Sequence, residues 1–108
     1  MKKVLMICAT FGALSGLAMA DSWSGTLIDE HCANRNATKA CEAKRSTSRF
    51  LLDVNGTTYR LDGRTNQDVH SAMLETKGLT KRAPVTAIMT GQLRSNGKID
   101  AETIAIQQ

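Results

Sequence analysis

Alternating apolar and polar positions predict a β-hairpin at the centre of the chain. Two alternating runs, residues 49–54 and 57–62, flank the dipeptide Asn55-Gly56. Asn-Gly between two such runs is a strong hairpin signal, because both residues of the tight turn adopt positive φ. A two-residue turn sets Val54 opposite Thr57 and gathers the apolar side chains on one face: Phe50, Leu52, Val54, Tyr59 and Leu61. The opposite, mainly polar face then carries Leu51, Asp53, Thr58, Arg60 and the facing pair Arg49 and Asp62.

Three further segments have the pattern of strands. Residues 22–29 alternate through Trp23, Gly25 and Leu27, and Pro84 precedes a run over residues 85–94. A last run covers residues 98–106.

The turn between these last two runs contains Asn96-Gly97. A three-residue loop with Gly97 in the left-handed region pairs Leu93 with Ile99, Gly91 with Ala101 and Thr90 with Glu102. This register assigns Ile88, Ile104 and Ile106 to the second face of the hairpin. A glycine in mid-strand, Gly91, indicates a sharp bend.

One helix is predicted between the third and fourth strands, over residues 66–77. Thr65 followed by Asp68 has the spacing of a capping box. Gly78 and Leu79 suit the end of the helix, as a glycine in positive φ followed by an apolar contact. The apolar and small residues that recur at helical spacing are Val69, Ala72, Met73 and Thr76.

The order strand, strand, strand, helix, strand, strand is that of the OB-fold, a five-stranded Greek-key barrel. The segments SGTLID (24–29), VTAIMTGQL (85–93) and IDAETI (99–104) resemble small exported bacterial OB-fold domains, and the resemblance spans residues 22–106. It implies a mainly β, OB-like barrel that binds small or charged ligands. It transfers no functional residue, because the Cys32/Cys41 pair departs from the usual pattern. An unrelated small β-barrel or sandwich is the alternative.

The first twenty residues have the features of a secretory signal peptide. Lys2 and Lys3 precede an apolar run over residues 4–18, and the small residues Ala18 and Ala20 fit a cleavage site after Ala20. The sequence therefore predicts a removed signal peptide (1–20) and a single domain (21–108). We expect a periplasmic or secreted protein with no integral membrane segment after cleavage.

Composition limits the classes of function. A chain of 108 residues holds one domain at most, and its net charge falls from +4 to +2 when the two leader lysines are removed. OB-folds that bind single-stranded nucleic acid stack bases on exposed aromatic rings. Beyond the leader, the aromatic residues are Trp23, Phe50 and Tyr59, and the hairpin register turns Phe50 and Tyr59 inward. Nucleic acid is therefore not an expected partner.

Cys32 and Cys41 remain after cleavage, and in an oxidising compartment such a pair forms a disulfide. Closing a loop of this size stabilises by about 2.7 kcal/mol in the chain-entropy model. The alternative is a metal-handling protein that binds zinc or copper through His31, Cys32, Cys41 and His70. The cysteine spacing is not that of a standard zinc finger. His70 lies off the Val69/Met73 stripe, on the side of the helix expected to face solvent.

Five basic residues cluster in and after the cysteine loop, and they carry the functional prediction: Arg35, Lys39, Lys44, Arg45 and Arg49. Such a cluster favours an anionic ligand. The sequence has no C-x-x-C motif, nucleophile elbow or glycine-rich phosphate loop, so neither catalysis nor a cofactor is expected. The prediction is an exported binding module that takes a small or acidic ligand, or an envelope protein, on the loop 30–48 and the adjoining barrel face.

Overall fold

The computed structural model describes residues 20–35, 41–79 and 83–108. The predicted signal peptide, apart from Ala20, lies outside the described residues, as does Lys39. Among the helices of the described part, none is long and apolar enough to cross a membrane.

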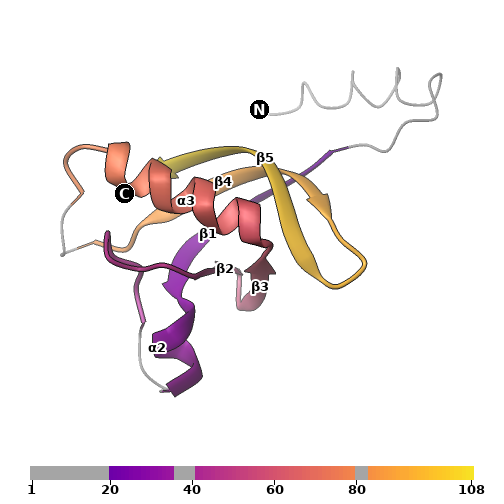
Figure 1. Cartoon of the computed structure of the whole chain (residues 1–108), viewed down its shortest axis with the longest axis horizontal. Coiled ribbons are helices and arrows are strands. Elements are labelled where there is room, and N and C mark those ends of the chain that lie inside the picture. Colours follow the sequence, from indigo (N-terminus) through magenta and orange to yellow (C-terminus); the bar gives the residue numbers. More distant parts are fainter. Residues whose placement is uncertain (1–19, 36–40, 80–82) are drawn as a thin grey trace.

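Five strands are hydrogen-bonded in a closed ring in the order β1, β2, β3, β5, β4 and back to β1 (Figure 1). Neighbouring strands are antiparallel except β3 and β5, which are parallel. The predicted mainly β class and the helix between the third and fourth strands are confirmed. In chain order the elements are β1 (Asp21–Asp29), α2 (Glu30–Arg35), β2 (Phe50–Val54), β3 (Thr57–Leu61), α3 (Gly63–Glu75), β4 (Thr86–Leu93) and β5 (Lys98–Gln107).

Strand β1 closes the ring by pairing along its two halves with different neighbours. Its first half, 21–26, pairs with β4, and its second half, 26–29, pairs with β2. Gly25 lies next to this change of partner, where a Cβ atom would overlap the carbonyl oxygen of Asp53. The glycine therefore allows β1 and β2 to approach closely at the bend.

The β2–β3 hairpin has the predicted register, with Val54 opposite Thr57 and Leu52 opposite Tyr59. Asn55 and Gly56 have φ values of 52° and 92°, as the predicted turn requires. The inward-facing residues form part of a core that also includes Leu27, Val69, Met73, Met89 and Ile99. Leu51 differs from the expectation of an exposed polar face: it is only 9% exposed.

The β4–β5 hairpin has the predicted three-residue loop, with Gly97 at φ 84° and Leu93 opposite Ile99. The predicted pairing of Thr90 with Glu102 is wrong. A bulge between Thr90 and Gly91 leaves Glu102 unpaired and sets Thr90 opposite Thr103.

This bulge shifts the remainder of β5 by one residue and reverses its faces. Ile104 and Ile106 lie opposite the buried residues Met89 and Ala87, and both pack against the core. Their predicted place on the second face is therefore wrong. Ile88 does lie outside and is 37% exposed.

Helix α3 begins earlier than predicted and has a different cap. Asp62 is the N-cap, and its Oδ1 accepts a hydrogen bond from the Thr65 backbone N–H at 2.8 Å. Thr65 is instead fully buried inside the helix, where its hydroxyl oxygen accepts from the Ala101 N–H at 2.9 Å. The end of the helix is closer to the prediction, since Gly78 has positive φ and Leu79 packs against the core.

The predicted disulfide between Cys32 and Cys41 is confirmed, with an Sγ–Sγ distance of 2.02 Å. The expectation of a single helix is wrong, because α2 forms a short second helix at the start of the cysteine loop. Its first turn receives a side-chain cap: Asp29 Oδ1 accepts from the Cys32 N–H at 3.2 Å.

Asp100 on β5 is held by two arginines. Arg64 from the first turn of α3 and Arg94 from the β4–β5 loop each donate to one oxygen of its carboxylate. The hydrogen bond from Arg64, followed by that from Arg94, lowers the pKa of Asp100 below its ordinary value. Folding is therefore favoured by this carboxylate when it is ionised, and the contribution is lost as the pH falls through the lowered pKa.

Asp100→Asn is expected to lower the melting temperature at pH 7 by more than Asp68→Asn, because Asp68 pairs only with Arg64 at the exposed surface. The difference between the wild-type and Asp100→Asn proteins should shrink as the pH falls below about 4, where the unfolded carboxyl is protonated. Thermal unfolding of the three proteins between pH 2 and 7 measures this. A difference that stays constant over this range contradicts the assignment.

Candidate ligand-binding face

The four described residues of the predicted basic patch have different surroundings. Arg35 is exposed at the end of α2, and Lys44 and Arg45 lie in the segment between β1 and β2. Arg49 precedes β2 and turns toward Glu30. Residues adjacent in the sequence therefore point to different parts of the molecule.

Arg45 binds the carboxyl end of α3. Its Nη2 donates to the Thr76 carbonyl oxygen at 2.8 Å, and its Nη1 lies 3.3 Å from the Met73 carbonyl oxygen. A cation at this end satisfies carbonyl groups that have no partner within the helix and complements the helix dipole. Arg45 therefore joins the β1–β2 segment to α3.

Glu30 organises two arginines on the outer side of the ring. It is only 7% exposed. Arg49 Nε donates to Glu30 Oε1 at 2.9 Å, and Arg60 Nε lies 3.6 Å from Glu30 Oε2. The two arginine side chains are nevertheless 61% and 66% exposed. One buried carboxylate thus orients two guanidinium groups whose remaining donors face solvent.

Lys98 adds a third cation beside them. Lys98 on β5 is the register partner of Arg60 on the parallel strand β3, while their neighbours Ile99 and Leu61 form a buried pair. Lys98 and Arg60 therefore share the outer face of the ring. Within the described residues Lys98 forms no ion pair, and its charge faces that of Arg60 across the two strands.

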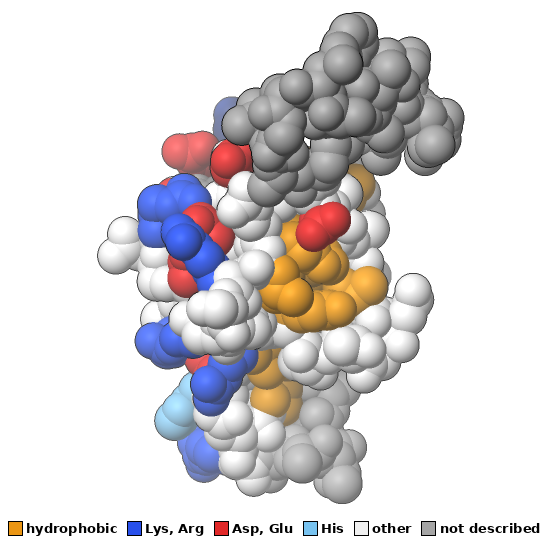
Figure 2. Space-filling model, turned by 90° about the vertical axis from the view of Figure 1, so that its right-hand side faces the viewer, with side chains coloured by type: hydrophobic (Ala, Val, Ile, Leu, Met, Phe, Trp, Pro, Cys, Tyr) orange, Lys and Arg blue, Asp and Glu red, His pale blue; other side chains and the backbone are white. Residues whose placement is uncertain are grey.

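An apolar strip borders these cations. Across the sheet Ile28, Leu51 and Arg60 are successive register partners, with Lys98 next to Arg60. We call the surface formed by Ile28, Arg49, Arg60 and Lys98, over the nearly buried Leu51, the cationic face. Lys, Arg, Asp and Glu side chains are mixed along one margin of the molecule (Figure 2).

The residues of the metal hypothesis have other partners. Cys32 and Cys41 are bonded to each other, so neither offers a thiolate. His70 is partly buried rather than facing solvent, because its Nδ1 lies 3.1 Å from the Thr47 carbonyl oxygen. His31 is exposed on α2. In the described part of the chain no three His, Cys, Asp or Glu side chains are grouped to hold a metal ion.

Sequence reasoning missed Glu30, Arg60 and Lys98 as parts of a site. The alternation of the hairpin did place Arg60 on its outer face, and this position could have marked Arg60 as a candidate ligand-binding residue. The approach of Lys98 depends on the parallel contact between β3 and β5, which no local pattern encodes.

Comparisons with known protein families, with curated proteins and with solved structures find no match to this chain. The functional argument therefore rests on the geometry of the cationic face.

Proposed function

We propose that this chain is an exported binding module, periplasmic or secreted, with an OB-like barrel that binds an anionic ligand on the cationic face. The ring order β1-β2-β3-β5-β4, with a helix between β3 and β4, is the order of an OB-fold and supports the finer assignment. The ligand is a small polyanion or an acidic segment of an envelope protein. The proposed role is binding and needs neither catalysis nor a cofactor.

The observation that carries the proposal is the pair of exposed arginines oriented by buried Glu30. A guanidinium has five N–H donors, and the contacts of Arg49 and Arg60 with Glu30 run through Nε, which leaves the terminal nitrogens for a ligand. These nitrogens match the oxygens of a carboxylate or phosphate. Because Glu30 hydrogen-bonds Arg49 and attracts Arg60, a ligand meets donors that have lost part of their conformational entropy.

The position of Lys98 supports the same proposal. Like charges on directly facing strand positions destabilise a sheet, and Arg60 and Lys98 form such a pair. An anion bound between them would remove the repulsion.

Lys98→Glu is expected to weaken binding of citrate, pyrophosphate and an acidic oligosaccharide by about tenfold, since one charge-assisted hydrogen bond contributes about 1.5 kcal/mol. The affinities are measured by NMR titration of the mature chain at fixed ionic strength, and the shifted amides should map to the cationic face. Lys77→Glu is the matched control, because it makes the same change of charge at an exposed position after α3. Equal weakening by both variants, shifts that map elsewhere, or no saturation by any probe contradicts the proposal.

A further inference from the structure

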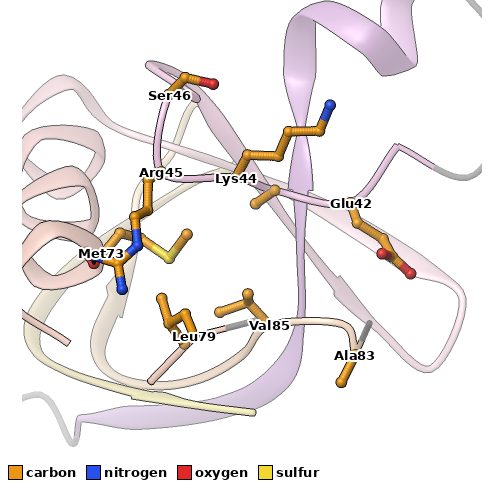
Figure 3. A pocket seen from close by; sticks show the side chains of 9 residues that line it. Glu42, Lys44, Arg45, Ser46, Met73, Leu79, Ala83 and Val85 are labelled. Carbon is orange, nitrogen blue, oxygen red and sulfur yellow. Dashed lines mark hydrogen bonds between the residues drawn. The ribbon is translucent and has the colours of Figure 1, made fainter. Parts of the chain in front are cut away.

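A hollow of about 470 Å³ opens beside the carboxyl end of α3 (Figure 3). Described residues from three parts of the chain line it: Met73 of α3, residues 79, 83 and 85 before β4, and residues 42–46 before β2. Its size lies within the range of small-molecule pockets. The lining residues are Glu42, Ala43, Lys44, Arg45, Ser46, Met73, Leu79, Ala83 and Val85.

The floor of the hollow is apolar and fixed by the fold. Met73, Val85 and Ala43 are almost fully buried, and Leu79 packs against the same core. Backbone hydrogen bonds to β1 hold two walls: Leu27 N–H donates to the Val85 carbonyl at 2.8 Å, and Ala43 N–H donates to the Leu27 carbonyl at 3.2 Å. An apolar group that enters therefore meets a preformed surface.

The β1–β2 wall is fixed in the same way. Lys44 N–H donates to Thr47 Oγ1 at 2.9 Å, and Thr47 N–H donates to the Lys44 carbonyl at 3.0 Å. Thr47 Oγ1 in turn donates to Asp29 Oδ2 at 2.9 Å. The two hydrogen bonds between Lys44 and Thr47 fix the backbone on both sides of Arg45.

Arg45 places a positive charge at one end of the hollow. Its bonds to the carbonyls at the end of α3 hold the guanidinium beside Met73, as Figure 3 shows. The hydrogen bonds of Arg45 to the end of α3 run through its terminal nitrogens, and within the described residues its Nε–H is left for a ligand. Glu42 lies at the other end, near Ala83 (Figure 3). The hollow is therefore apolar in the middle, and its rim carries two cations, Arg45 and Lys44, and one carboxylate, Glu42.

We propose that this hollow binds a small amphipathic carboxylate. Its aliphatic body lies on Met73, Leu79 and Val85, and its carboxylate meets Arg45. The two cations of the rim outnumber its one carboxylate, and this balance favours an anionic head group. A cationic amphiphile would face Arg45 and Lys44, and a neutral one would leave the guanidinium without a charged partner. The site is separate from the cationic face and does not depend on the function proposed for it.

Three probes of equal chain length test the charge preference: octanoate, octanol and octylammonium. Titration of the mature, disulfide-bonded chain is followed by NMR. Octanoate is expected to saturate with an affinity about tenfold higher than that of the other two, and to shift the amides of Met73, Leu79 and Val85. Equal affinity for octylammonium, or no saturation with octanoate at millimolar concentration, overturns the proposal.

Two variants test the location. Ala83→Trp fills the hollow from a partly exposed position and should abolish octanoate binding, whereas Ile88→Trp on the outer face of β4 should leave it unchanged. Arg45→Met should remove the preference for octanoate over octanol while the apolar contact persists. If this variant fails to fold, Ala83→Trp still decides the outcome.

The two proposals can be tested independently of each other. Lys98→Glu should leave octanoate binding unchanged, and Ala83→Trp should leave citrate binding unchanged. Octanoate binding that survives Ala83→Trp, or that is lost in Lys98→Glu, places the carboxylate outside the hollow and overturns the proposal.

Discussion

Asn66→Ala is expected to lower the free energy of unfolding by about 3 kcal/mol, because one buried amide satisfies two backbone groups. Asn66 lies in the first turns of α3 and is 5% exposed. Its Oδ1 accepts from the Phe50 N–H at 2.7 Å, and its Nδ2 donates to the Leu61 carbonyl at 3.1 Å. The side chain therefore joins α3 to both β2 and β3.

Alanine would leave the Phe50 N–H and the Leu61 carbonyl buried without these partners. Each such group costs about 1–3 kcal/mol. Urea unfolding measures the change, and Gln67→Ala is the control because it makes a similar truncation at the exposed neighbouring position. The control should change stability by less than about 0.5 kcal/mol. A loss below 1 kcal/mol for Asn66→Ala would show that water replaces the amide.

Local patterns predicted those features whose causes are local. Asn55-Gly56 determines its own turn, and the alternation on either side of it determines the register of β2 and β3. The same holds for the loop at Gly97 and for the glycine after α3. The disulfide was predicted from the oxidising compartment expected of an exported chain and from the count of cysteines.

The errors arise where a distant segment decides between two local choices. Asp62 and Thr65 are both good helix caps, and only the position of Ala101 distinguishes them. Beside the bulge in the β4–β5 hairpin, the Ala101 N–H donates a hydrogen bond to the hydroxyl oxygen of Thr65, which is 36 residues away in the chain. Thr65 is therefore buried within the helix, and Asp62 takes the cap.

Most residues of the candidate cationic face were not singled out from the sequence, for the same physical reason. A run of basic residues in one loop indicates charge but not direction, and Arg45 and Arg49 are held by different partners. The cationic face instead combines residues from β1, β2, β3 and β5. The hollow beside α3 likewise requires three segments that approach one another only in the folded chain.

Gly91→Ala is expected to destabilise the protein at least as much as Asn66→Ala. The free energy of unfolding should fall by at least about 3 kcal/mol, or the chain should fail to fold. A Cβ atom at Gly91 would overlap the Asp100 carbonyl oxygen and lie 2.7 Å from Ala101 Cα. Both atoms belong to the backbone of β5 beside the bulge, so no side-chain rotation can relieve the contact. Strand β4 would have to move away from β5, and the bulge that turns Ile104 and Ile106 inward would be lost.

Gly97→Ala separates this steric effect from the general effect of replacing a glycine. Gly97 has φ 84° and open space around its Cα, so alanine there is strained only by its backbone conformation and should lose about 1 kcal/mol. Chemical unfolding of both variants gives the comparison. If the bulge forces β4 and β5 together at Gly91, the loss there must exceed the loss at Gly97 by about 2 kcal/mol or more. Equal losses would mean that the two strands can separate at Gly91 at little cost, and that the bulge is not what determines the inner face of β5.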